Sequence, residues 1–171
     1  MTKTNIIKTV LDDLFDGQRP SKWVTRERPK IDRIACPWAI RRFIDAEAVI
    51  LYVPTDKVFA VAEREKAIAF DIPGAPISHE GELCSFDTLL RRFELNDPAL
   101  LAVAAIVRGA DTDNHALAPE AAGLHAISLG LSLTYSDDHA MLEQGVIVYD
   151  ALLSWAKSAR GVRHAWTPAK P

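Results

Sequence analysis

Residues 23–53 read WVTRERPKIDRIACPWAIRRFIDAEAVILYV, and this stretch decides the fold class. Residues 23–25 favour a first strand, and the apolar run AVILYV at 48–53 is typical of a buried strand. Pro37 suits the first turn of a helix, where its missing N–H costs nothing. We therefore place a helix start near Cys36 and Pro37 and continue the helix to Ile44, so that a strand, a helix and a second strand follow one another.

The rest of the chain extends this pattern and then changes it. Helices are expected at 4–16 and 55–65, and a short strand at 68–72. From residue 85 onward only helices are expected, at 85–93, 97–109, 119–133 and 136–158. The sequence thus predicts a single α+β domain, with a small N-terminal αβ half packed on a C-terminal helical half. We expect an N-terminal helical extension at 1–21, the domain at 22–158 and a tail at 159–171.

Composition excludes several classes of protein. The 171 residues are 49% hydrophobic and 25% charged, with a formal net charge of −3, as in a globular protein with a core rather than a nucleic-acid-binding polycation. No apolar run approaches the roughly 20 residues that span a bilayer. Asp12 and Asp13 interrupt the N-terminal apolar stretch, which excludes a signal-peptide core. We therefore expect a cytoplasmic protein with no membrane segment and no direct nucleic-acid contact.

Basic residues are concentrated in one segment. Residues 19–42 hold eight Lys or Arg and two acids, a local charge of +6 that leaves −9 for the rest of the chain. Arg26, Arg28 and Arg33 flank the expected helix start, where free N–H groups and guanidinium groups would together suit a tetrahedral oxyanion. The alternative is that these arginines form ion pairs with acids such as Asp32 or Asp45.

The string HEGELCSFD at 79–87 joins a histidine, acids and a thiol just before an expected helix. His79 with Cys84 suits a borderline or soft metal ion. Cys84, near a helix N-terminus, is expected to have a lowered pKa and is the candidate redox thiol. The alternative is that Ser85 and Asp87 only begin the helix, with Cys84 as a small buried side chain.

A second candidate metal set draws on later strings. His139 and Glu143 are one helical turn apart and share a helix face, a spacing that recurs in helical metal sites. Asp111, in the string RGADT at 108–112, lies in an expected loop and would complete them with His79. A transition-metal ion is the cofactor that this set would hold. Alternatively, His139 is simply exposed in the first turn of its helix.

Five ordered strings carry a resemblance to a known family. They are WVTRERPKIDRIACPWAIRRFID at 23–45, FDIPG at 70–74, HEGELCSFD at 79–87, IVRGADT at 106–112 and DDHAMLEQGVIVYDALLSWA at 137–156. Over about residues 22–157 the chain resembles the C-terminal domain of the ChrB chromate-resistance proteins. That resemblance implies a role in bacterial chromate resistance, with Arg26, Arg33 and His79 as chromate-sensing groups. Longer members regulate transcription through an additional N-terminal region, for which the first 21 residues here offer no room.

Three functional hypotheses follow. The leading one is a domain that binds or senses a tetrahedral oxyanion such as chromate through Arg26, Arg28, Arg33 and His79. The second is a metal-dependent redox or detoxification enzyme. The third is an interaction module without catalysis, in which the amphipathic segment 4–16 contacts a protein partner or a second copy of the chain.

Overall fold

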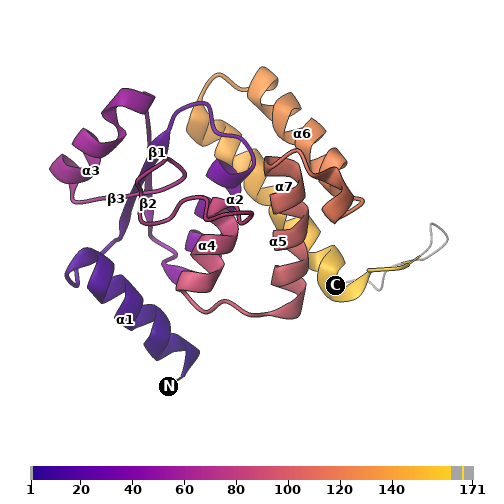
Figure 1. Ribbon diagram of the computed structural model, residues 1–171, viewed down its shortest axis with the longest axis horizontal. Helices are drawn as coiled ribbons and strands as arrows, with labels where there is room; N and C mark the ends of the chain where they lie inside the picture. Colours follow the sequence, from indigo (N-terminus) through magenta and orange to yellow (C-terminus); the bar gives the residue numbers. More distant parts are fainter. Residues whose placement is uncertain (1, 163–166, 168–171) are drawn as a thin grey trace.

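The computed structural model describes residues 2–162 and 167, and its centre is a three-stranded parallel sheet flanked by helices (Figure 1). The strands are β1 (Lys22–Arg26), β2 (Val49–Val53) and β3 (Ile68–Ala69), in the order β2-β1-β3. Helices make up the second half of the chain. The predicted single-domain α+β class is confirmed.

The two connections between the strands lead to opposite sides of β1. Helix α2 (Asp32–Ala39) and a π-helical turn (Ile40–Ile44) lead from β1 to β2. A 3₁₀ turn (Thr55–Lys57) and α3 (Val58–Glu65) lead from β2 to β3. β2 and β3 lie on opposite sides of β1. The first connection therefore moves to one side of β1, and the second crosses back to the other side. Ligands of parallel sheets bind beyond the carboxyl ends of the strands at such a point.

The two faces of β1 contact different parts of the core. Trp23 points into the main core, whereas Val24 packs with Val58 and Val61 of α3 in a smaller cluster. This alternation is the two-residue period of a strand. Helix α1 (Lys3–Phe15) also packs on the main core, with the ring of Phe15 5.2 Å from that of Trp23. The apolar face of the N-terminal helix is therefore used within the chain.

The helical half consists of α4 (Ser85–Arg92), α5 (Pro98–Asp111), a 3₁₀ turn (His115–Leu117), α6 (Ala121–Thr134) and α7 (Asp138–Ser158). Helix α5 packs against both α6 and α7, and α7 also contacts α2, which joins the two halves (Figure 1). Within the described residues, no helix is both long and apolar enough to cross a bilayer. Most of the predicted tail at 159–171 lies outside the described residues.

The predicted start of the helix near Cys36 and Pro37 was wrong, because α2 already begins at Asp32 and Pro37 lies inside it. A proline inside a helix leaves the carbonyl group four residues earlier without its N–H donor. That carbonyl belongs to Arg33, and the hydroxyl of Tyr52 on β2 donates to it at 2.7 Å. A side chain from the neighbouring strand thus supplies the hydrogen bond that the proline removes.

Other boundaries shift for local reasons. Strand β3 is two residues long because the chain turns at Asp71, whose φ is 51°. Helix α4 is capped by Cys84 rather than by Ser85, and the carboxylate of Asp87 accepts from the backbone N–H of Cys84 at 3.2 Å. The hydroxyl of Ser85 is used elsewhere, since it donates to Asp71 at 2.8 Å. Thr55 opens the 3₁₀ turn rather than α3 itself.

Gly145 on α7 lies close against α2, where the two halves contact each other. A Cβ atom at this position would lie 2.4 Å from Cγ2 of Ile34 on α2, whereas one at Gly130 on α6 would meet nothing within 4 Å. We expect Gly145→Ala to destabilise the protein by about 1–2 kcal/mol, since overpacking outweighs the gain in helix propensity. Gly130→Ala should stabilise it by about 0.5–1 kcal/mol. Urea unfolding of both variants checks this, and equal signs for the two would contradict it.

Candidate functional site

Charged side chains from four segments gather beyond the carboxyl edge of the sheet. Arg26 ends β1, Asp32 and Arg33 begin α2, and Asp71 follows β3. Asp111 ends α5, and His79 lies in the segment between β3 and α4. The parallel strands and the helix ends thus bring three aspartates, two arginines and a histidine to one place, which is where a parallel sheet is expected to hold a ligand.

The carboxylate of Asp71 holds both arginines. Nη2 of Arg26 donates to Oδ2 of Asp71 at 2.9 Å and to its carbonyl oxygen at 2.7 Å. Nε of Arg33 lies 3.3 Å from the same Oδ2. Asp71 is almost fully buried, so the two guanidinium groups are fixed next to each other by a single acid. Among the described residues, Nε of Arg26 is buried and has no hydrogen-bond partner.

Arg28, the third predicted arginine, lies elsewhere. Its guanidinium group donates to the carbonyl oxygens of Tyr135 and Ser136 at 2.9 and 3.0 Å, and also to that of Ser132. The carbonyl of Ser132 lies in the last turn of α6 and the other two directly follow the helix, where a cation is favourable. The structure therefore joins Arg26, Arg33 and His79, but it uses Arg28 to cap a helix.

His79 lies among the carboxylates of the cluster. Its Nε2 is 3.0 Å from Oδ2 of Asp111, 3.6 Å from Oδ2 of Asp32 and 3.7 Å from Oδ1 of Asp71. The side chain of His79 is 44% exposed, whereas that of Asp32 is fully buried. One imidazole nitrogen and several carboxylate oxygens thus lie close together, and solvent reaches them from the side of His79.

Asp32 is held in position by the start of α4. Its Oδ2 accepts from the backbone N–H groups of Ser85 at 2.5 Å and Phe86 at 3.3 Å. The preceding residue, Ile31, has a φ of 39°, a conformation that is costly for a β-branched side chain. The hydroxyl of Tyr149 donates to the carbonyl oxygen of Ile31 at 3.0 Å. Strain of this kind persists where the surrounding structure enforces it, and it clusters at functional sites.

The crowding of these groups changes their proton affinities. Proximity to the carboxylate of Asp32 raises the pKa of His79 to about 9. Burial, with help from the charges of Asp32 and Asp71, raises the pKa of Asp111 to about 7. Burial also lowers the pKa of Arg33, and the positive charge of Arg26 acts in the same direction. Perturbed groups gathered at one edge of a sheet are typical of a functional site.

The other two members of the predicted metal set do not join His79 and Asp111. His139 is exposed on α7, with its ring 5.4 Å from that of Tyr52. Glu143 is exposed near Trp38, Arg41 and Arg42, where it lines a separate surface hollow. His139 and Glu143 lie one turn apart on α7, but their side chains do not group with those of His79 and Asp111. Asp32 groups with His79 and Asp111 in their place.

The prediction of a lowered pKa for Cys84 was wrong. The thiol is buried, and burial together with the nearby charges of Asp32 and Asp87 raises its pKa. Its Sγ lies 3.3 Å from Oδ2 of Asp87 and donates to it. A thiol that stays protonated is a poor nucleophile. Cys84 therefore acts as a capping and packing side chain in this structure.

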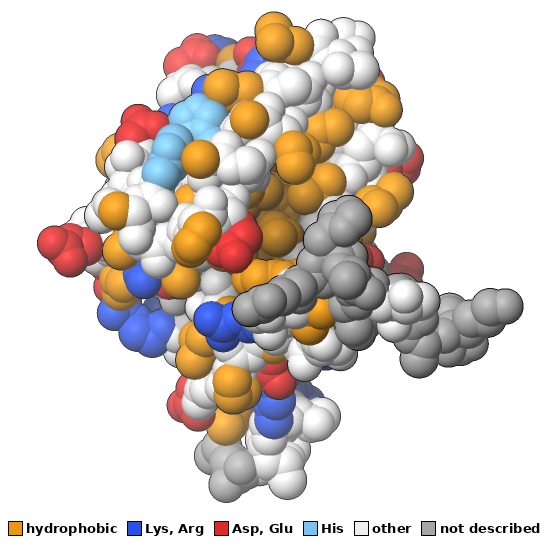
Figure 2. All heavy atoms as spheres, turned by 90° about the vertical axis from the view of Figure 1, so that its right-hand side faces the viewer, with side chains coloured by type: hydrophobic (Ala, Val, Ile, Leu, Met, Phe, Trp, Pro, Cys, Tyr) orange, Lys and Arg blue, Asp and Glu red, His pale blue; other side chains and the backbone are white. Residues whose placement is uncertain are grey.

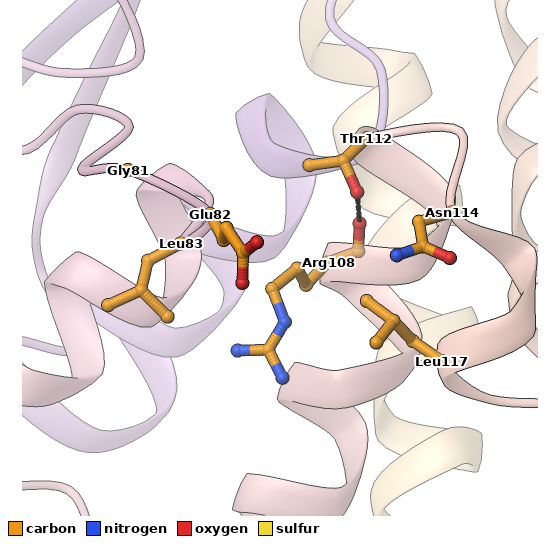
Figure 3. Close-up of a pocket in the computed structure, with 7 residues that line it drawn as sticks. All are labelled: Gly81, Glu82, Leu83, Arg108, Thr112, Asn114 and Leu117. Atoms are coloured by element: carbon orange, nitrogen blue, oxygen red, sulfur yellow. Dashed lines mark hydrogen bonds between the residues drawn. The ribbon is translucent and has the colours of Figure 1, made fainter.

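A cleft of about 490 Å³ flanks the cluster (Figure 3). Arg108 of α5 lies at its centre, between Glu82 on one side and Asn114 on the other. Nη1 of Arg108 is anchored to Oδ1 of Asp87 at 3.1 Å. Thr112, which also lines the cleft, directly follows Asp111 in the chain. The cleft therefore opens next to Asp111, one member of the cluster.

A second group with metal-ligating atoms lies on the surface, formed by Asp113, His115 and His125. The two imidazole rings are 5.3 Å apart, and the side chain of Asp113 is 83% exposed. Figure 2 shows histidine side chains lying together on a face that also carries hydrophobic ones. Exposed apolar side chains of α6 include Ile127 and Leu133.

Asp32 and Asp71 are the site residues that sequence reasoning missed. Asp32 was considered only as an ion-pair partner of the arginines, and Asp71 only as part of the string FDIPG. The signal that identifies them is positional, since Asp71 lies two residues after the end of β3 and Asp32 begins the helix after β1. Once the strands are known to be parallel, both are expected at the same edge.

Comparison with known proteins decides the family. A family model described as "ChrB, C-terminal domain" matches residues 23–156. The chain belongs to the ChrB C-terminal domain family. The resemblance found in the five sequence strings is thereby confirmed.

A curated relative agrees with the family match. Protein ChrB from Cupriavidus metallidurans is 33% identical over 140 residues, which cover 81% of this chain and 42% of that protein. The chain thus corresponds to less than half of the length of this relative. No solved structure matches the chain. The matched residues 23–156 include every member of the cluster at the sheet edge.

Proposed function

We propose that this ChrB-type domain binds a tetrahedral oxyanion, with chromate as the physiological candidate, at the carboxyl edge of its sheet through Arg26 and Arg33. The observation that carries the proposal is the convergence of two guanidinium groups on one buried aspartate, with Nε of Arg26 left unpartnered. Family membership supports the choice of chromate among oxyanions of the same shape.

The chemistry of the arginine pair suits such a ligand. Asp71 engages Nη2 of Arg26 and Nε of Arg33, and Nη1 of Arg33 donates to the carbonyl oxygen of Glu27 at 2.9 Å. Nε and Nη1 of Arg26 and Nη2 of Arg33 remain for a second acceptor. A buried donor without a partner costs about 1–3 kcal/mol, and an oxyanion that accepts from Nε of Arg26 would recover this cost. Asp71 keeps the guanidinium groups in place when no ligand is bound. His79, 3.7 Å from Oδ1 of Asp71, is near enough to assist.

The test is calorimetric titration of the full chain with chromate and with sulfate. Arg33→Ala and Arg26→Ala should each weaken chromate binding by about 10- to 100-fold, since a hydrogen bond to a charged group contributes about 1.5–3 kcal/mol. Arg33→Lys keeps the charge without the planar guanidinium group. Its chromate affinity should lie between that of the unaltered protein and that of Arg33→Ala. Arg42→Ala is the matched control, because Arg42 belongs to the same basic segment but pairs with Asp150 at 2.8 Å.

Unchanged chromate affinity in Arg33→Ala would contradict the proposal. A loss of affinity in Arg42→Ala equal to that in Arg33→Ala would show that only the overall charge of the basic segment matters. Thermal melting of each variant separates lost binding from lost folding. Tighter binding of chromate than of sulfate is expected from a chromate-responsive domain, and the reverse order would identify a different physiological anion.

A metal-dependent function is the second candidate, and one observation favours it. Asp32, His79 and Asp111 each offer a ligand atom, and these atoms lie within 4.8 Å of one another. The third hypothesis, an interaction module that uses segment 4–16, is less well supported. The apolar side chains Leu11 and Phe15 of that helix already pack on the core of the domain.

A further inference from the structure

The geometry of Asp32, His79 and Asp111 has the dimensions of a metal site. With metal–ligand bonds of about 2.1 Å, neighbouring ligand atoms of a tetrahedral ion are about 3.4 Å apart. Nε2 of His79 lies 3.0 Å from Oδ2 of Asp111 and 3.6 Å from Oδ2 of Asp32, on either side of that separation. The three residues come from the end of α5, the segment before α4 and the start of α2, so distant parts of the chain fix their arrangement.

A second observation is independent of this spacing. The other oxygen of Asp32, Oδ1, is buried and has no hydrogen-bond partner among the described residues. Asp32 is itself fully buried, and its Oδ2 already accepts from two backbone N–H groups of α4. An unsatisfied carboxylate oxygen is costly in the interior, and a bound cation is one of the few partners that would compensate it.

The local charge also favours a cation. Asp32, Asp71 and Asp111 bring three acidic groups together, and the two arginines that contact Asp71 do so on its Oδ2. Asp111 and Asp32 have no arginine or lysine partner among the ion pairs of the described residues, and their nearest ionisable partner is His79. A carboxylate pair that faces a single imidazole is therefore short of positive charge.

We propose that Asp32, His79 and Asp111 bind one divalent first-row transition-metal ion. The donor set of one imidazole nitrogen and two carboxylate oxygens suits Mn²⁺, Fe²⁺ or Zn²⁺ better than the thiolate-preferring ions. The proposal is independent of the oxyanion site, whose arginines lie on the other side of Asp71. In this assignment His79 binds the cation instead of assisting the oxyanion, which is held by Arg26 and Arg33 alone.

The surface group Asp113, His115 and His125 is the competing location within the chain. Its aspartate is 83% exposed, and no side-chain polar atom of the three is buried without a partner. Exposed side chains of this kind are hydrated when no ion is bound, so they gain less free energy from binding a metal ion than buried ones do. The competition makes it necessary to locate a bound ion as well as to detect it.

The experiment uses the full chain, prepared without an affinity tag and stripped with EDTA. Titration with Mn²⁺, followed by the electron paramagnetic resonance signal of the free ion, measures affinity and stoichiometry, and Zn²⁺ is titrated by calorimetry. We expect one tight site. Asp111→Asn and His79→Gln should each weaken it by at least about tenfold, since even residues that only orient metal ligands cost 10- to 100-fold.

Three control variants locate the ion. His125→Gln removes a ligand of the surface group, whereas His139→Gln and Glu143→Gln remove the residues that the sequence had placed with His79. All three should leave the tight site unchanged. Thermal melting with and without Mn²⁺ gives a second readout, because an ion that binds only the folded state raises the melting temperature.

Two results would overturn the proposal. One is the absence of tight binding of both Mn²⁺ and Zn²⁺. The other is binding that survives Asp111→Asn but is lost in His125→Gln, His139→Gln or Glu143→Gln. Chromate titration of the EDTA-stripped protein keeps the two proposals apart. Oxyanion binding that persists without metal supports the arginine site whatever the metal titrations show, and metal binding without oxyanion binding supports only the cation site.

Discussion

Replacement of Asp71 by alanine is expected to lower the free energy of unfolding by about 3 kcal/mol, because it removes one partner of a buried ion pair. Arg26 and Arg33 would lose their shared acceptor, and the hydroxyl of buried Ser85 would lose its acceptor at 2.8 Å. Alanine is also strained at a φ of 51°, which aspartate and asparagine tolerate better.

Two control variants separate these contributions. Asp71→Asn keeps an acceptor and the tolerance of positive φ while it removes the charge, so it should cost less than alanine. Asp12→Ala removes a comparable contact, 2.9 Å from Arg19, but at a side chain that is 43% exposed, and it should cost less than about 1 kcal/mol. Urea unfolding measures all three. A cost for Asp71→Ala no larger than that for Asp12→Ala would show that the buried cluster does not support the fold.

Replacement of Asp111 by asparagine is expected to stabilise the metal-free protein, and the gain should depend on pH. The pKa of Asp111 is raised from 3.8 in the unfolded chain to about 7 in the folded protein. Below about pH 4 the side chain is neutral in both states, so the substitution has little effect. Between pH 4 and 7 the carboxylate increasingly destabilises the folded state, and above pH 7 the penalty is complete.

The size of the effect follows from the same shift. Each pKa unit corresponds to 1.36 kcal/mol, and we expect about 2 kcal/mol at pH 8 once the loss of the contact with His79 is included. For a chain of this length that gain raises the melting temperature by about 4–8 °C. Calorimetry in EDTA at pH 4 and pH 8 measures it. Asp56→Asn, at a side chain that is 72% exposed, is the control with no such dependence. A lower melting temperature for Asp111→Asn at pH 8 would contradict the expectation.

The two substitutions test opposite contributions of carboxylates in the same cluster to the stability of the fold. Asp71 stabilises the fold because its charge is matched by two arginines. Asp111 destabilises the metal-free fold because its charge is not matched by an arginine or a lysine. A carboxylate that is kept in place despite its cost is typical of a site selected for binding rather than for stability.

Local pattern predicted most of the elements correctly. The helices at 97–109 and 136–158 were expected from Asp97 and Asp137 at their starts, and both residues do cap α5 and α7. The strand predicted at 48–53 from its uninterrupted apolar run is present as β2, although only Ile50 of β2 is fully buried. Capping and periodicity depend on residues a few positions apart, which the sequence displays directly.

The start of α2 could not be predicted in the same way. In helices, proline is most common in the first turn. Pro37 is tolerated inside α2 because the hydroxyl of Tyr52 donates a hydrogen bond to the carbonyl oxygen of Arg33. The two partners lie 19 residues apart and meet only because β2 pairs with β1. The choice between a redox thiol and a small buried side chain for Cys84 was left open for a related reason, since its burial depends on packing around the start of α4.

For the site, the sequence by itself determined the family, the α+β class and four of the six clustered residues, Arg26, Arg33, His79 and Asp111. Only the tertiary structure decided that Asp32 and Asp71 join them, that Arg28 caps α6, and that His139 and Glu143 lie apart. Residue type and local spacing show which chemistry a segment can supply. Which segments meet depends on the parallel order of the strands and on the packing of helix ends, for example the contact between Asp32 and Ser85, 53 residues apart.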